Sequence, residues 1–403
     1  MAALDNLIVQ AREQRASDVH IAPGVPVRFR VDGSLVDAND HVLQAEDCRV
    51  LAEEAAGDLM DALGRTGELD LAVTFSGDIR CRINIFMAQG APCLAIRLLA
   101  PRIPKLETLG LPEVVNEFSR YNKGIVLVTG ETGSGKSTTL AAIIDDINHT
   151  RREHVITLED PVEYVYTPDL CSIDQREVGK DTQSFDDGLR ASLREDPDII
   201  LVGEMRDLST IETALTAAET GHLVFGTLHT QSASDSVDRL VGVFPPERQA
   251  QIRMQLSMTL RAVISQQLLV RAGGEGRSVA CEVMIVNPAI QNLIREGKTP
   301  QIKNTLATSA ELGSVTMDNY LLKMEREGLI DHETAVQAAH DREFVSHGGM
   351  GSLSTGVMGS SRGTTTGMMG SSRGDTVGGG AGTTGMMGSS RRVGRRGGNT
   401  RRL

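Results

Sequence analysis

A glycine-rich loop at residues 130–138 carries the most specific chemistry in this chain. Its sequence, Gly-Glu-Thr-Gly-Ser-Gly-Lys-Ser-Thr, matches the GxxxxGK[ST] pattern of phosphate-binding loops. Gly130, Gly133 and Gly135 lack a Cβ atom, so the backbone can take positive φ and approach phosphate oxygens closely. The amides of such a loop point inward at the positive end of the next helix. The predicted nucleotide-binding residues are Gly130, Thr132, Gly133, Ser134, Gly135, Lys136, Ser137 and Thr138.

Two side chains of this loop suit a nucleoside triphosphate with its metal. Lys136 would set an ammonium group against the β- and γ-phosphates, and the Ser137 hydroxyl suits Mg²⁺. An apolar run at 125–128 leads into the loop, and a helical pattern at 137–148 leads out of it. We therefore expect ATP and Mg²⁺ as ligands, in preference to a chance glycine turn before a helix.

Carboxylates follow two predicted strands at ends that would face the loop. Residues 159–163, Glu-Asp-Pro-Val-Glu, come directly after a strand at 154–158, and one acid could orient or deprotonate a water for attack on the γ-phosphate. From the residues alone, an acidic loop that caps a helix is an equal alternative. Glu204 follows an apolar strand at 198–203 and could reach Mg²⁺ or its waters. The residue before it is Gly203, and an aspartate at that position would make the assignment of Glu204 to Mg²⁺ stronger.

Two histidines, His222 and His229, flank the next apolar strand. Seven residues of extended chain span about 23 Å, so the two side chains cannot share one metal ion. His229 would lie at the carboxyl end, where it could sense the γ-phosphate. His222 would lie at the opposite end and is the weaker candidate. A structural role is the more common use of a lone histidine.

The elements that must position these residues fall into two parts. Residues 1–100 have the pattern of a mixed α/β domain, and residues 101–112, with three prolines, resemble a linker. Residues 113–345 alternate strands and helices as a parallel sheet does. The expected strands are 19–21, 25–31, 35–36, 69–75, 79–87, 93–99, 124–129, 154–158, 198–203 and 222–228. The expected helices are one near residues 4–11 and others at 45–63, 137–148, 184–195, 208–219, 246–269, 289–295, 317–327 and 333–340.

Arginines on the N-terminal strands have two interpretations. Arg80 and Arg82 would share one face of their strand, and Arg97 lies on the next strand. Composition alone favours solvated charges on a sheet surface.

The charge of the chain is unevenly distributed. Residues 346–403 hold eight arginines and one aspartate, a net +7, in a sequence dominated by Gly, Ser, Thr and Met. Such a composition predicts a disordered basic tail, either a tether to an acidic surface or an inert linker. Because the whole chain carries −12, the first 345 residues carry −19, a poor match to nucleic acid or anionic lipid.

Cysteine usage and hydropathy indicate the compartment. The five cysteines are widely spaced without a CxxC pair, which fits a reducing compartment and no zinc site. No signal peptide or membrane-length apolar stretch is recognisable. We expect a cytoplasmic protein, peripheral to the inner membrane only through partners and without direct membrane insertion. Only 3% of residues are aromatic, which argues against base-stacking surfaces and a nucleic-acid partner.

Taken together, these motifs resemble one family, the hexameric secretion ATPases of type IV pili and type II secretion. The stretch 193–207 matches the signature of that family throughout, including Gly203. Residues 159–163 resemble its Asp box, and residues 220–230 resemble its His box. The resemblance covers residues 1–345 and implies an N-terminal PAS-like domain followed by a RecA-like P-loop ATPase domain with a helical C-terminal part.

The resemblance is greatest to the PilT-type branch, the pilus retraction motors. Residues 16–20 and 28–33 resemble its N-terminal domain, and residues 289–296 resemble its C-terminal motif, with Gln291 in place of the usual arginine. Glu131 replaces the usual proline of the loop, where only backbone is needed. Only Cys281 lies where extension and secretion relatives carry a four-cysteine zinc insert.

The resemblance also implies roles. Glu163 would be the catalytic base, Glu204 the acid near Mg²⁺ and His229 the γ-phosphate sensor. His222 would act at a subunit boundary. Arg82 and Arg97 would reach the nucleotide from the N-terminal domain, an expectation that replaces the solvated-arginine interpretation.

The implied function is a hexameric Mg²⁺-ATP-hydrolysing motor for pilus retraction. Its partners would be five further copies of the chain, an inner-membrane platform protein and a paralogous retraction ATPase. The alternatives are a pilus extension or type II secretion assembly ATPase, a non-hydrolysing nucleotide-gated scaffold and, least favoured by the −19 body, a DNA translocase.

Overall fold

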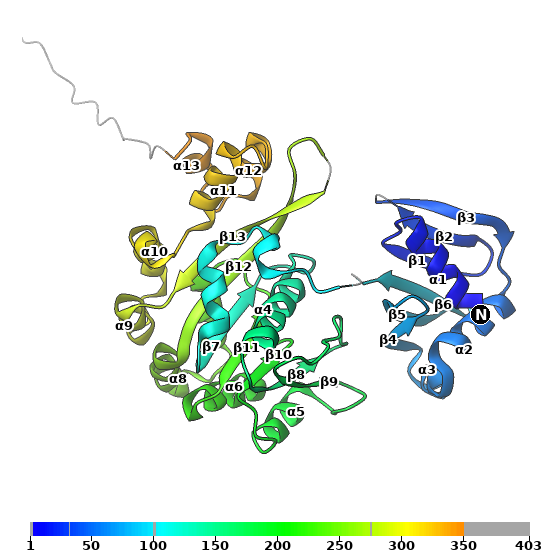
Figure 1. Ribbon diagram of the computed structural model, residues 1–403, viewed down its shortest axis with the longest axis horizontal. Helices are drawn as coiled ribbons and strands as arrows, with labels where there is room; N and C mark the ends of the chain where they lie inside the picture. The colour runs from blue at the N-terminus through cyan, green and yellow to red at the C-terminus, as the bar shows by residue number, and fades with distance from the viewer. Residues whose placement is uncertain (1–2, 32, 100–101, 275, 350–403) are drawn as a thin grey trace, which may run out of the picture. The chain divides into compact units, whose positions relative to one another are not determined.

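The computed structural model describes residues 3–31, 33–99, 102–274 and 276–349 (Figure 1). Two β-sheets with flanking helices make up this part of the chain, so the α/β class expected from the sequence is confirmed. All but the first four residues of the expected tail at 346–403 lie outside the described residues.

The first sheet is antiparallel and has six strands in the order β3-β2-β1-β6-β5-β4. One face is apolar because alternate residues such as Ile83 and Ile85 point to the same side, where they pack with Leu4 and Ile8 of the first helix. The strands are β1 (Asp18–Ile21), β2 (Pro26–Val31), β3 (Ser34–Val42), β4 (Glu68–Phe75), β5 (Ile79–Ala88) and β6 (Ala91–Leu98).

Three α-helices accompany this sheet: α1 (Ala3–Glu13), α2 (Ala45–Ala56) and α3 (Met60–Thr66). The expectation of a single helix over 45–63 is wrong, since a short 3₁₀ turn, η1 (Gly57–Leu59), separates α2 from α3. Gly57 there takes a φ of 51°, which a regular right-handed helix does not allow.

The second sheet has seven strands in the order β13-β12-β7-β11-β10-β8-β9. Neighbours from β12 to β9 run parallel, and β13 is antiparallel to β12. Both faces are apolar, which is typical of a parallel sheet covered by helices on both sides. The strands are β7 (Gly124–Thr129), β8 (His154–Glu159), β9 (Ser172–Glu177), β10 (Ile199–Val202), β11 (Leu223–Leu228), β12 (Leu260–Val270) and β13 (Arg277–Ile285).

Helices cover the two faces of this sheet separately. Val126 and Val128 of β7 pack in one core with α4 and α11, whereas Ile125 and Leu127 pack in another with α6 and α8. The helices are α4 (Lys136–Thr150), α5 (Phe185–Ser192), α6 (Leu208–Thr220), α7 (Ala233–Gly242), α8 (Pro246–Thr259), α9 (Pro288–Glu296), α10 (Ile302–Thr308), α11 (Met317–Arg326), α12 (His332–Ala338) and α13 (Arg342–Ser346) (Figure 1). Short 3₁₀ turns are η2 (Leu106–Leu109), η3 (Glu113–Arg120), η4 (Thr299–Gln301) and η5 (Ala310–Leu312).

One long helix expected from the sequence is wrong in its second half. Residues 246–269 form α8 up to Thr259, and the chain continues as strand β12. Val263 and Ile264 are fully buried between β7 and β13. A short apolar run of this kind suits a buried strand as well as a buried helix, so periodicity alone could not separate them. Strand β9 has no counterpart in the sequence-based expectation, because its residues are largely polar.

Among the described residues, no helix is both long enough and apolar enough to cross a membrane. The five cysteines are buried and unpaired.

Candidate functional site

The glycine-rich loop connects β7 to α4 at the carboxyl end of the second sheet, with β12 and β11 on either side of β7. Gly130, Gly133 and Gly135 all have positive φ, at 142°, 80° and 94°. A Cβ atom at residue 130 would lie only 2.4 Å from the carbonyl oxygen of Gln266 on β12. Glycine at that position therefore allows the loop to leave β7 beside β12, so that its amides form a concave rim ahead of α4.

Lys136 opens α4, and its ammonium group donates to the carbonyl oxygens of Gly130 and Glu131, each at 2.9 Å. Burial lowers the pKa of this amine, and the carboxylates of Glu204 and Glu163 partly oppose that effect. The Ser134 hydroxyl is buried without a protein partner. A loop with three positive-φ glycines, a half-buried cation and an unpartnered hydroxyl together fit a phosphate chain.

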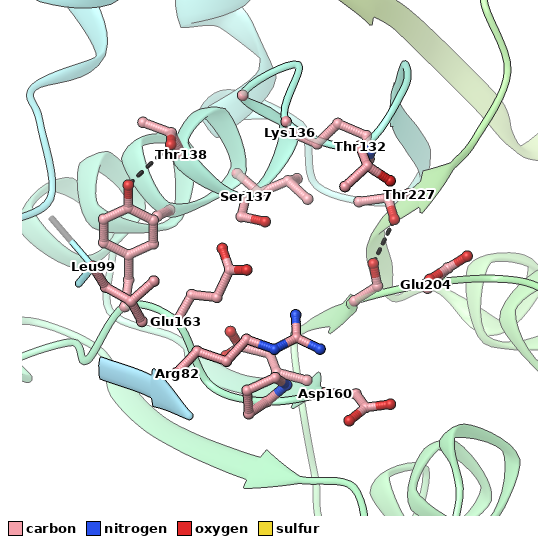
Figure 2. Close-up of a pocket in the computed structure, with 18 of the residues that line it drawn as sticks. Arg82, Leu99, Thr132, Lys136, Ser137, Thr138, Asp160, Glu163, Glu204 and Thr227 are labelled. Carbon is pink, nitrogen blue, oxygen red and sulfur yellow. Dashed lines mark hydrogen bonds between the residues drawn. The ribbon is translucent and has the colours of Figure 1, made fainter. Parts of the chain in front are cut away.

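A cavity of about 520 Å³ opens in front of the loop. Its lining joins the loop to the ends of three strands and includes Asp160, Glu163, Glu204 and Thr227, which Figure 2 labels, together with His229. Of the predicted site residues, only His222, Gly130 and Ser134 are not among its lining residues. Gly130 and Ser134 are buried residues of the loop, and His222 lines a second hollow.

Glu163 lies on the connection between β8 and β9, and its carboxylate points toward the first turn of α4 (Figure 2). Next to it, the Tyr164 hydroxyl is 2.9 Å from Thr138 Oγ1, so the loop after β8 is attached to that helix turn. Glu159, at the end of β8, is more enclosed, and burial raises the pKa of its carboxyl group. Of the two glutamates, Glu163 therefore has the better geometry for a group that accepts a proton from water at the phosphate.

Glu204 follows β10, and its Oε1 lies 3.2 Å from His229 Nε2. Arg206 also contacts this carboxylate. The preceding Gly203 packs against the end of β8, where a Cβ atom would be 2.9 Å from the Leu158 carbonyl oxygen. A larger residue would push the two strand ends apart, which gives a physical reason for glycine in place of aspartate.

The donors present fit Mg²⁺ in a substrate complex. No group of three or more His, Cys, Asp or Glu side chains within the described residues could enclose an ion. The Ser137 hydroxyl and the Glu204 carboxylate face the same cavity. Mg²⁺ is commonly held by one or two protein oxygens together with substrate phosphates and waters, and this sparse oxygen set suits that mode.

The two histidines lie in different surroundings. His229 lines the nucleotide cavity, whereas His222 precedes β11 and lines a second hollow with Arg151 and Asp198. The Nδ1 atom of His222 is 2.9 Å from the Ala217 carbonyl oxygen. Their separation to opposite ends of one strand agrees with the spacing argument.

Arg82 and Arg97 also line the nucleotide cavity. Their side chains are 43% and 66% exposed, and Arg97 pairs with Asp18 at 3.0 Å. Each can therefore still change partner when phosphate is present.

Two residues that contact the loop after β8 are not among the predicted site residues. Arg80, for which composition favours a solvated charge, donates to the Val162 carbonyl oxygen at 3.3 Å and lies 3.7 Å from Glu177. Arg80 lies two residues before Arg82 on the same strand face, and this spacing could have indicated that both arginines face the same site. Gln175 binds the same loop from β9, and no signal pointed to it because that strand was not expected.

Comparison with known proteins agrees with this geometry. A family model described as type II/IV secretion system protein matches residues 1–343. The type IV pilus retraction ATPase PilT of Pseudomonas aeruginosa is 45% identical over 337 residues, which cover 83% of this chain and 98% of that protein. A twitching motility protein of Neisseria gonorrhoeae is 44% identical over 319 residues, with 79% of this chain and 85% of that protein covered.

A solved structure is similar over the same part of the chain. The crystal structure of the pilus retraction motor PilT with bound ADP has a TM-score of 0.79 and 45% identity. The match covers 85% of this chain and 98% of that one.

Proposed function

Because this chain belongs to the type II/IV secretion system protein family, and within it to the PilT-type pilus retraction ATPases, we propose that it is a Mg²⁺-dependent motor that drives retraction of a type IV pilus. The chain is an ATPase of that family. The observation that carries the proposal is a single cavity shared by the phosphate-binding loop, Glu163, Glu204 and His229.

The residues of this cavity would divide the chemistry among them. The loop amides and Lys136 hold the phosphates, while Ser137 and Glu204 hold Mg²⁺, which supplies charge neutralisation at the phosphate oxygens. Glu163 accepts a proton from the attacking water. His229, held beside Glu204, detects whether a γ-phosphate is present.

Arg82 and Arg97 would couple this chemistry to motion. Arginines from the N-terminal sheet stabilise phosphoryl charge only while that sheet is closed over the nucleotide. Hydrolysis and release of phosphate remove the charge that holds them. Closing and opening then follow the state of the nucleotide, which is how cleavage of a bond can produce force.

We propose that the working form is a homohexamer in which His222 acts at the subunit boundary. This hexamer would act at the cytoplasmic side of the inner membrane, where it would contact a platform protein of the pilus machine. A paralogous retraction ATPase would be its second partner. Gln291, which stands where the C-terminal motif has arginine, is the main departure from the branch.

The closest rival is an extension or type II secretion assembly ATPase. Those relatives are expected to carry a four-cysteine zinc insert, and the five cysteines of this chain are widely spaced. A non-hydrolysing scaffold is disfavoured because both acids, Glu163 and Glu204, are present at the cavity.

Phosphate release by purified protein tests the hydrolytic part of the proposal. Glu204→Ala should lower ATP turnover at least ~100-fold, the scale of a lost transition-state charge contact, while nucleotide binding stays within about threefold. Full turnover by this variant would overturn the role of Glu204, and no turnover by the unaltered protein would favour the scaffold.

A further inference from the structure

Gln175 makes three hydrogen bonds to the segment that carries Glu163. It lies on β9, directly opposite Thr157 of β8 in the parallel register. Its Nε2 donates to Glu159 Oε1 at 3.1 Å and to the Tyr164 carbonyl oxygen at 2.7 Å, and its Oε1 accepts from the Tyr166 amide at 3.0 Å.

These bonds use both amide hydrogens of one side chain together with its oxygen. They attach the segment 159–166 to β9 at points before and after Glu163. Thr157 Oγ1 also donates to Glu159 Oε1, at 2.7 Å, so the first attachment point is held from two strands. An amide whose oxygen and both hydrogens are hydrogen-bonded has one preferred orientation.

Tyr164 extends this arrangement to the nucleotide loop. Its carbonyl group is held by Gln175, and its hydroxyl is 2.9 Å from Thr138 Oγ1, one residue beyond Ser137 (Figure 2). Tyr164, the residue next to Glu163, is therefore held on one side by β9 through its carbonyl group and on the other by the first turn of α4 through its hydroxyl. A second β9 residue on the same face, Glu177, accepts from the Val162 amide at 3.2 Å.

We propose that Gln175 is a positioning residue for the proposed catalytic base: it holds the Glu159 side chain before Glu163 and the backbone of Tyr164 and Tyr166 after it, so that the Glu163 carboxylate faces the site of the γ-phosphate. The inference rests on the proposed function, because it takes Glu163 to be the group that receives the proton of the attacking water. Gln175 itself is not among the residues that line the nucleotide cavity.

A residue with this role affects turnover more than binding. Among the described residues, no hydrogen bond joins the Gln175 side chain to the phosphate-binding loop, so nucleotide affinity should remain. A base displaced by about 1 Å can cost on the order of 100-fold in rate. We therefore expect kcat to fall about 10- to 100-fold in Gln175 variants, with KM and the dissociation constant of a fluorescent ATP analogue changed less than about threefold.

The test uses the full chain with four single variants and the double variant that combines Glu163→Gln with Gln175→Met. Gln175→Met keeps the length and removes all three bonds, whereas Gln175→Glu keeps the shape and one acceptor but loses both donors. Gln301→Glu, at an exposed position, is the matched control for the change of charge and should behave as the unaltered protein does. Glu163→Gln reports on the base itself. Thermal unfolding of each variant shows which ones are folded. The test needs only one of the two Gln175 variants to be folded.

The outcomes separate this inference from the function on which it rests. The inference is supported if kcat falls in a folded Gln175 variant at nearly constant affinity, and if adding Gln175→Met to Glu163→Gln causes no further loss. It is overturned if Glu163→Gln is inactive while folded Gln175 variants keep kcat within twofold, or if their affinity falls as much as their kcat. If Glu163→Gln keeps full turnover, the role of Glu163 fails instead, and the proposal for Gln175 fails with it.

Discussion

At the scale of single residues, glycine has two different uses in the nucleotide loop. Gly130 and Gly133 both have positive φ, which any side chain would strain. Only Gly130 is also crowded, by the Gln266 carbonyl oxygen and the Ser134 hydroxyl, whereas a Cβ at residue 133 would meet nothing within 4 Å. At residue 133, glycine is needed only for the backbone conformation. At residue 130, it is needed for the backbone conformation and also for the close packing of its neighbours.

This difference predicts unequal effects of alanine. Gly130→Ala should abolish nucleotide binding and cost about 3 kcal/mol or more in stability, because rigid backbone must move away from β12. Gly133→Ala should cost only the strain of its φ, about 1 kcal/mol. Thermal unfolding and nucleotide titration of the two variants measure the contrast, and equal losses would contradict it.

A second residue-scale prediction concerns pH. His154 is partly buried, which by itself lowers its pKa, but hydrogen bonds to Asp174 at 2.9 Å and to the Asp196 carbonyl oxygen outweigh burial and raise the pKa above 6.5. A raised histidine pKa stabilises the fold below about pH 6.5, and this gain disappears as the pH rises through the folded-state value.

Asp174→Asn should therefore destabilise the protein at pH 6 and hardly at pH 9. Asp174 is two-thirds exposed, so solvent screening limits the effect to about 1 kcal/mol or less. Urea unfolding at the two pH values checks it. A loss of the same size at both values would show that the ion pair is not the cause.

The sequence predicted those site residues that can be recognised from their residue type and their position along the chain. The phosphate-binding loop, the acids after two strands and His229 follow from residue type and position at strand ends. Arg80 and Gln175 did not, because their contacts with the segment 159–166 join parts of the chain that only folding brings together. Gln175 also lies on a polar edge strand, which lacks the apolar pattern that reveals a buried one.

At the scale of elements, the strands of the second sheet differ in how well their bounds can be predicted from the sequence. The strands that lead to the site, β7, β8, β10 and β11, were predicted within one residue at most ends, since glycine, proline or acidic residues bound them. Strand β12 lies in the second half of a segment whose apolar pattern predicts one long helix. Its pairing with β7 is reinforced by a 2.8 Å contact between the Thr129 and Ser265 hydroxyls, a feature that no pattern along the chain could reveal.

Glu282 connects the sheet to two helices. This residue of β13 is 3% exposed, and burial raises the pKa of its carboxyl group. It accepts from the amide of Ala233, the first residue of α7, at 2.9 Å, and from that of Met317, the first residue of α11, at 3.5 Å. A carboxylate at two helix N-termini is stabilised by both.

Glu282→Ala should therefore destabilise the protein by about 3 kcal/mol, because two buried amides lose their acceptor. Glu282→Gln keeps one acceptor oxygen and should cost at least about 1 kcal/mol less. Since α7 begins just after His229, the alanine variant should also lower turnover. Thermal unfolding and phosphate release measure both effects, and equal melting temperatures for the two variants would refute the role of the carboxylate oxygens.

At the scale of the whole molecule, the proposed cycle joins the two sheets through nucleotide. Arg82 and Arg97 contribute to the cavity from the first sheet, while the loop and the acids come from the second. An acidic body of −19 leaves protein partners as better candidates than nucleic acid for the work that this cycle drives.

The direction of pilus movement is the central claim, and counting surface pili tests it most directly. A strain without this gene would be complemented with the unaltered gene or with Glu204→Ala, and its pili counted by electron microscopy. We predict surplus, non-retracting pili in the deletion strain and with Glu204→Ala, and normal numbers with the unaltered gene. Cells without pili in the deletion strain would contradict retraction and identify an extension motor instead.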